Sequence, residues 1–120
     1  MKTRYQDLPI YITKDGSLIR ELMHPARHGN AHQSLAEATI SPGFETALHK
    51  HLRTEELYHI VAGRGVMTCG QECFEVGPGD TVHIPPGTLH CIRNNGPEPL
   101  RILCCCAPAY THEDAVLWKA

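Results

Sequence analysis

Two histidines separated by a single residue are the first feature of the chain that could do chemistry. His49 and His51 lie in the stretch "ALHKHLRTEELYHI", and the carboxylates of Glu55 and Glu56 follow shortly after them. On a β-strand, residues i and i+2 face the same side with their backbones ~7 Å apart, so both imidazoles can reach one ion. Exposed histidines are common on strands, so this pair alone only raises the hypothesis of a metal site.

Strand parity places Glu55 and Glu56 on opposite faces of the strand, but it does not show which face is buried. Glu56 shares its face with Tyr58 and Ile60, and such neighbours would make it a partly buried acid. A buried carboxylate is costly unless it is paired or bound to a cation. In the opposite register Leu57 is the core residue and Glu56 is solvated. Parity alone leaves both registers open.

A third histidine follows a tight turn in the second half of the chain. The segment "GDTVHIPPGTLHCIRN" places a Pro-Pro-Gly run just before His90. Proline and glycine favour a sharp turn, which can bring His90 back beside a neighbouring strand. There it can join His49 and His51, so the second half of the chain favours the metal hypothesis.

The spacing of these residues resembles the two motifs of the cupin family. The first motif is filled by Gly43, His49, His51, Glu56 and Gly63, and the second by Gly79, Pro85, Gly87, His90 and Asn94. Every fixed position of both patterns is occupied, and the fifteen residues between the motifs match the short spacer of small bacterial single-domain cupins.

This resemblance implies a jelly-roll β-barrel over nearly the whole chain, with one divalent transition metal inside. The ligands that it implies are His49, His51, Glu56 and His90, and the six-residue spacing to Gly63 favours Glu56 over its neighbour. Such donors suit Fe²⁺ or Mn²⁺, which we favour, and also Ni²⁺, Zn²⁺, Co²⁺ and Cu²⁺. Four protein ligands on an octahedral ion leave two positions for water, O₂ or a chelating substrate. Many small cupins are homodimers, so a homodimer is expected.

Parity also predicts the surroundings of the ion. Ala47 shares the face of the first two histidines, Tyr58 and Ile60 share that of Glu56, and Ile92 shares that of the third histidine. Tyr58 is the candidate catalytic residue, as a proton donor or a hydrogen-bond partner of the substrate, although a core tyrosine with a satisfied hydroxyl is the simple alternative.

The elements that must position these residues are short β-strands. Glycine and proline punctuate the chain, and about eight strands with turns between them predict an antiparallel all-β sandwich or barrel. We expect one domain over residues 1–120, with N-terminal strands at about 8–22, the metal-binding barrel at about 33–107 and a tail at 108–120. The segment "MHPARHGNAH" predicts a loop, and only "THEDAVLW" in the tail could form a short helix.

Composition narrows the class of protein. The net charge of −2 offers no basic face for nucleic acid, and no apolar run is long enough for a signal peptide or a membrane span, so a cytoplasmic protein is expected.

The six cysteines lack the spacing of a structural zinc site, and the consecutive Cys104, Cys105 and Cys106 would alternate between two faces. Cys104–Cys106 and Arg101 could line the barrel, and His83 could support the site or face outward.

Three functions fit these features, and the first of them is the one that we favour from the sequence. The first is a metal-dependent oxygenase acting on a small organic molecule, although Glu56 counts against a thiol dioxygenase of the cysteine-dioxygenase type. The second is a non-oxidative isomerase, lyase or decarboxylase, in which the ion polarises a carbonyl and Tyr58 or a bound water moves the proton. The third is a cupin that binds a small ligand without turnover. Fold alone does not choose among them.

Overall fold

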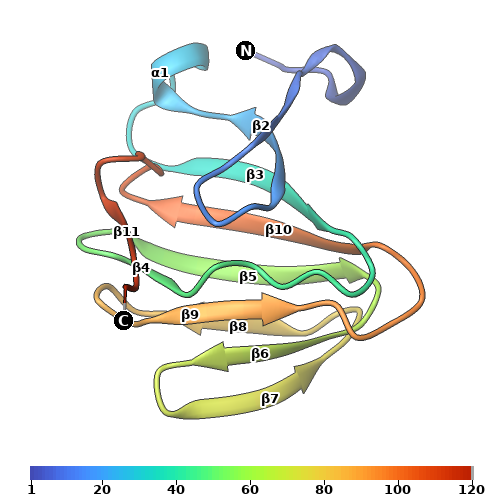
Figure 1. The fold of residues 1–120 in the computed structure, drawn as a ribbon. Coiled ribbons are helices and arrows are strands. Elements are labelled where there is room, and N and C mark those ends of the chain that lie inside the picture. The colour runs from blue at the N-terminus through green and yellow to red at the C-terminus, as the bar shows by residue number, and fades with distance from the viewer. Residues whose placement is uncertain (120) are drawn as a thin grey trace.

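The computed structural model describes residues 1–119, and eleven strands account for most of its regular structure (Figure 1). In chain order the strands are β1 (Ile10–Ile12), β2 (Leu18–Met23), β3 (Ser34–Ile40), β4 (His49–His51), β5 (Glu55–Ala62), β6 (Gly65–Cys69), β7 (Glu72–Val76), β8 (Thr81–Ile84), β9 (His90–Arg93), β10 (Leu100–Ala107) and β11 (Ala115–Leu117). Two short helices complete the order, a 3₁₀ helix at Tyr5–Asp7 and α1 at Pro25–His28. The prediction of an all-β fold is confirmed.

Two antiparallel sheets form the walls of the barrel. One has the strand order β1-β2-β3-β10-β5-β8 and the other the order β11-β4-β9-β6-β7. Alternate residues of both sheets point inward, as the pleat requires. The fully buried side chains Ile40, Ile60, Met67, Ile92 and Ile102 form the core between the sheets. This is the jelly-roll arrangement that the family resemblance implied.

Strand register brings the two halves of the sequence together at the centre of the barrel. His49 on β4 is the direct cross-strand partner of His90 on β9. On the facing sheet, Glu56 on β5 pairs with Cys106 on β10. Both pairs come from segments far apart in the sequence, and all four side chains are buried.

The predicted loop at residues 23–32 contains a helical turn, α1, which corrects that expectation. Pro25 occupies the first turn of α1, where a missing backbone N–H costs nothing. The His24 side chain caps the turn by accepting from the Ala26 amide, and Gly29 ends it with a φ of 82°. His24 is also half-buried, because its Nε2 lies 2.7 Å from the Tyr110 carbonyl oxygen.

The tail is not helical, so the alternative of a short C-terminal helix is wrong. The Thr111 hydroxyl accepts from the Asp114 amide as a cap would, but the chain leaves this turn and forms β11. This strand pairs with β4, the strand of the first two histidines, with Ala115 opposite His51 and Leu117 opposite His49. An open strand edge offers hydrogen bonds that an isolated turn of helix lacks. Residue 120 lies outside the described residues.

Candidate metal centre

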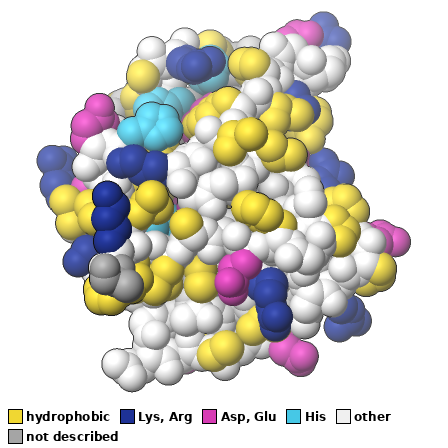
Figure 2. All heavy atoms as spheres, in the orientation of Figure 1, with side chains coloured by type: hydrophobic (Ala, Val, Ile, Leu, Met, Phe, Trp, Pro, Cys, Tyr) yellow, Lys and Arg dark blue, Asp and Glu magenta, His cyan; other side chains and the backbone are white. Residues whose placement is uncertain are grey.

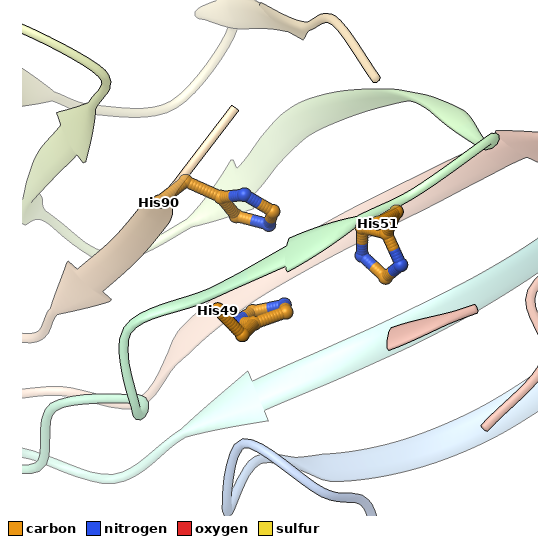
Figure 3. Close-up of side chains that lie close together, drawn as sticks. All are labelled: His49, His51 and His90. Carbon is orange, nitrogen blue, oxygen red and sulfur yellow. The ribbon is translucent and has the colours of Figure 1, made fainter. Parts of the chain in front are cut away.

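Three histidines converge inside the barrel. His49 and His51 come from β4 and His90 comes from β9, and their rings point toward one space (Figure 3). One ring nitrogen from each lies within 4.8 Å of the other two, and all three residues are buried. Three imidazoles at this separation could hold a metal ion.

Backbone carbonyls orient two of the rings. His49 Nδ1 lies 2.9 Å from the Ala47 carbonyl oxygen, and His90 Nδ1 lies 2.9 Å from that of Thr88. A carbonyl oxygen only accepts hydrogen bonds, so Nδ1 carries the proton in both rings. The Nε2 lone pair of each neutral ring therefore faces the shared space, as a metal-binding histidine requires.

Glu56 lies on the opposite wall with one oxygen toward the histidines. Its Oε1 is 3.2 Å from His51 Nε2 and 3.7 Å from His90 Nε2. Its Oε2 accepts a hydrogen bond from the Cys106 thiol at 3.3 Å. Burial would raise the pKa of Glu56, but the hydrogen bonds and the nearby imidazoles together hold it below its usual range. The carboxylate is therefore ionised and offers Oε1 to the same space.

Three buried polar atoms in this cluster have no hydrogen-bond partner: Glu56 Oε1, His90 Nε2 and His51 Nδ1. Buried polar atoms are rarely left unsatisfied, because each one costs roughly 1–3 kcal/mol. Two of the three, Glu56 Oε1 and His90 Nε2, face each other. A divalent ion between them would satisfy both, so the residues present fit a transition metal.

Burial also keeps His90 ready to bind a cation. Burial, together with the neighbouring His49, lowers the pKa of His90 to about 4. The imidazole is therefore neutral at physiological pH and presents a lone pair rather than a charge.

The thiol of Cys106 fixes the rotamer of Glu56, and its removal is expected to weaken metal binding. In Cys106→Ala the carboxylate loses its hydrogen-bond donor, and an outer-shell partner of this kind is worth about 10- to 100-fold in metal affinity. Cys106→Ser should restore most of the loss, because a hydroxyl donates to the same oxygen. Titration calorimetry with Mn²⁺ measures the effect. Cys105→Ala is the control, since Cys105 lies on the other face of β10, and equal affinity in both alanine variants would contradict the prediction.

A cavity of about 50 Å³ adjoins the cluster, which is room for a few water-sized groups. Tyr58 lines this cavity, and its ring centroid lies 6.1 Å from that of His90. Burial raises the pKa of Tyr58 well above its usual value, so the phenol keeps its proton. This position is compatible with the predicted proton donor, and the catalytic role stays a prediction.

Parity predicted the surroundings of the cluster with one error. Tyr58, Ile60 and Ile92 are buried as expected. Ala47 is exposed, because β4 begins only at His49 and the chain before it is not a regular strand. The alternation of parity therefore does not extend back to Ala47.

Other candidate residues lie outside the cluster. His83 faces outward, where its Nε2 lies 2.8 Å from Glu55 Oε2. Arg101 is not in the barrel either, since it pairs with Glu37 at 2.9 Å near the surface. In the run of cysteines, Cys104 and Cys106 line the cavity.

Sequence reasoning missed the cavity wall that comes from the two ends of the chain. Tyr11, Asp15 and Glu21 belong to the β1–β2 hairpin, and Tyr110 belongs to the tail. A second hollow also has Tyr11, Glu21 and Tyr110 in its lining, so these three side chains lie between the two hollows. Figure 2 shows histidine and charged side chains gathered at this end of the barrel, near α1 and β11. The cavity-lining residues of the hairpin and the tail belong to neither of the two sequence motifs, so the sequence did not single them out.

The fold and the cluster together define a class of protein: a small jelly-roll barrel with a histidine-lined centre that could hold a metal. The sequence model of the cupin domain matches residues 36–106, which include the whole cluster. The chain belongs to the cupin domain family. It is also 55% identical to an uncharacterized protein of Methanocaldococcus jannaschii, MJ1618, over 95% of this chain and 91% of that protein.

Solved structures share the fold. Pac13, a nucleoside dehydratase from Streptomyces, superposes with a TM-score of 0.79 at 18% identity, covering 99% of this chain and 91% of Pac13. A putative sugar phosphate isomerase from Acidithiobacillus ferrooxidans superposes with a TM-score of 0.66 at 28% identity, covering 78% of this chain and 60% of that one. The likeness to Pac13 shows the fold alone.

No helix in the described residues is long and apolar enough to cross a membrane.

Proposed function

We propose that the chain is a metal-dependent enzyme that catalyses an isomerisation or an elimination. The substrate would be a small oxygen-containing organic molecule that is not oxidised in the reaction. His49, His51, His90 and Glu56 would hold the ion. The observation that carries this proposal is the set of buried atoms without a hydrogen-bond partner, Glu56 Oε1 and His90 Nε2, which could be metal ligands. They lie beside a cavity that is lined by groups able to carry a proton. When bound, a divalent ion there would act as a Lewis acid on a substrate oxygen.

Protein groups around the cavity support proton transfer. Tyr58 is protonated and buried at the cavity wall, so it can donate to a substrate oxygen. Burial also raises the pKa of Glu21, whose Oε1 accepts a hydrogen bond from the Tyr11 hydroxyl at 3.1 Å. A carboxyl group with a raised pKa exchanges protons nearer to neutral pH than an exposed one. Glu21 and Tyr11 would bind the end of the substrate that lies toward the surface.

The named activity of one similar protein favours the same chemistry. Sugar phosphate isomerisation, named for the putative isomerase at 28% identity, is non-oxidative and acts on a hydroxyl-rich molecule. A metal-dependent oxygenase is the second candidate, because three imidazoles and a carboxylate also suit Fe²⁺ or Mn²⁺. A cupin that only binds its ligand is the remaining alternative.

The deciding experiment is elemental analysis of protein purified without added metal, combined with turnover assays with and without oxygen. We expect one divalent ion per chain and conversion of a hydroxyl-rich substrate that continues under nitrogen. Conversion that stops without oxygen and consumes it stoichiometrically would favour the oxygenase. A protein that binds no metal even after reconstitution would refute both.

Acid is expected to release the metal, because a histidine must be neutral to act as a ligand. Histidine has an ordinary pKa of ~6.5, so protons compete with the ion progressively as the pH falls below that value. His90, with its pKa of about 4, takes up a proton in the metal-free protein only in strongly acidic solution. Metal content after dialysis at a series of pH values measures the release. Full occupancy down to strongly acidic pH would contradict the ligand assignment.

We further propose a homodimer in the cytoplasm. Leu35, Cys105 and Leu57 are cross-strand neighbours on β3, β10 and β5, and they form an apolar row on the outer face of the larger sheet. Leu35 and Leu57 are 38% and 42% exposed, and Val61 continues the row on β5 at 49%. Such a row is a candidate surface for a second copy. Sedimentation of the purified protein distinguishes a dimer from a monomer.

A further inference from the structure

A second carboxylate reaches the histidine cluster from outside the matched family region. Asp15 lies in the turn between β1 and β2, and its side chain is only 10% exposed. Its Oδ2 is 3.8 Å from His49 Nε2. Its Oδ1 accepts two hydrogen bonds from Ser17, from the amide at 3.0 Å and from the hydroxyl at 2.7 Å. Oδ1 is therefore occupied, and Oδ2 is the oxygen directed at the cluster.

The contact between Asp15 and His49 joins two hydrogen-bond acceptors. The proton of the neutral His49 ring is on Nδ1, where it is donated to Ala47, so Nε2 carries a lone pair. An ionised carboxylate also only accepts. Two acceptors are held this close at low energetic cost when a cation lies between them. One ion at the usual bond length of ~2.1 Å can bind atoms up to ~4.2 Å apart. The Asp15–His49 pair, at 3.8 Å, lies within that limit. The group of ligand atoms that all lie within 4.8 Å of one another contains the three histidines and not Asp15, so Asp15 would approach the ion from the His49 side.

The turn that carries Asp15 is fixed in place. The Asp15 carbonyl oxygen accepts from the Ala47 amide at 2.9 Å, which joins the turn to the segment leading into β4. Gly16 has a φ of +93° and packs on Phe44, whose ring would lie 2.8 Å from an added Cβ. Lys14 Nζ donates to the carbonyl oxygens of His112 and Ala115 in the tail. The carboxylate is therefore preorganised rather than carried on a free loop.

The carboxylates around the cavity also favour a cation. Asp15, Glu21 and Glu56 line it, and Lys14 is the one Lys or Arg in the described lining. The Lys14 ammonium is directed at tail carbonyls at 2.7 and 2.9 Å instead of at these acids. Carboxylates removed from water are stable only when paired or bound to a metal.

We propose that Asp15 is a ligand of the same ion as His49, His51, His90 and Glu56, so that the site has five protein donors. This inference rests on the proposed metal-binding function. A six-coordinate ion with five protein donors keeps one open position, so the substrate binds it through a single oxygen. The substrate class is then a neutral alcohol or carbonyl compound, and bidentate anions are excluded by both coordination and charge.

Asp15→Asn tests the proposal, with Glu21→Gln as the matched control. Both variants remove one negative charge from the cavity wall, but only Asp15 lies against a histidine of the cluster, and asparagine can still accept from Ser17. Titration of the metal-free proteins with Co²⁺ gives the affinity, and the visible absorption of bound Co²⁺ reports its coordination. We expect Asp15→Asn to lose about 10- to 100-fold in affinity, the range known for groups that support a metal site, and to change the spectrum. Glu21→Gln should lower the Co²⁺ affinity at most about threefold, because the charge that it removes is more distant from the histidines.

Each outcome decides a different question. Equal affinities and unchanged spectra in the two variants, with tight binding by the wild type, would overturn the role of Asp15 and leave the histidine site standing. A wild-type protein that binds no Co²⁺ would overturn the proposed function and this inference together. Tight binding of oxalate to the Co²⁺ protein would also overturn the five-donor site, because oxalate needs two adjacent open positions.

Discussion

Replacement of His90 by alanine is expected to lower metal affinity by more than about 100-fold. Loss of an outer-shell partner alone costs about 10- to 100-fold, and His90 offers its Nε2 lone pair directly to the cluster. It is also fully buried and opposite His49 in the sheet, so its loss leaves a gap at the centre of the cluster. Titration calorimetry with Mn²⁺ or Co²⁺ on the metal-free protein measures the loss.

His83→Ala is the control for this variant. His83 precedes the same turn, but it is 55% exposed and contacts Glu55 at the surface. It should bind metal as the wild type does. Circular dichroism should show that His90→Ala keeps its β-structure, since the apolar core is large and lies on both sheets. A His90→Ala protein that folds and retains wild-type affinity would refute the histidine site.

Replacement of Gly63 by alanine is expected to cost more than about 3 kcal/mol in the free energy of unfolding. Gly63 has a φ of +85°, and an added Cβ would lie 2.6 Å from the Pro99 carbonyl oxygen and 2.8 Å from the Leu100 Cα. The left-handed conformation alone costs an alanine roughly 1–2 kcal/mol. The clash adds to this cost, because both contacted atoms belong to the backbone at the start of β10 and a side-chain rotation cannot relieve them.

Gly43→Ala separates the two contributions. Gly43 has a similar φ of +79°, but nothing lies within 4 Å of the position of its Cβ. It should therefore lose only the conformational cost of about 1–2 kcal/mol. Urea denaturation of both variants measures the difference between them. Equal losses would mean that the contact with β10 is not what requires glycine at position 63.

The fixed positions of the family pattern could be predicted from the sequence because they act through local geometry. Alternation along β5 put Glu56, Tyr58 and Ile60 on one face, and the six-residue spacing from Glu56 to Gly63 favoured that face as the inner one, where all three are buried. The turn before His90 returns the chain to β4, as the Pro-Pro-Gly run predicted, and Gly87 within it has a φ of +77°. Each of these inferences needed only a few consecutive residues.

Other features depend on contacts between distant segments, and the sequence did not reveal them. The tail forms β11 because β4 has a free edge, which is a property of the finished sheet rather than of the tail. Asp15 and Tyr110 reach the cavity only because the hairpin and the tail meet there, with Thr13 Oγ1 3.0 Å from the Tyr110 hydroxyl. Their types and spacing carry no periodic signal.

The cavity wall is therefore built from two separate parts of the chain, one that could bind the metal and one that forms the outer wall, and this separation could be used in engineering. The segment that matches the family, residues 36–106, holds the three histidines and Glu56, whereas the outer wall comes from the β1–β2 hairpin and the tail. Lys14 ties these two terminal segments to each other. They would have to be exchanged as a pair in a chimera with another barrel of this family. Such a graft would change the shape of the entrance and leave the histidines where they are.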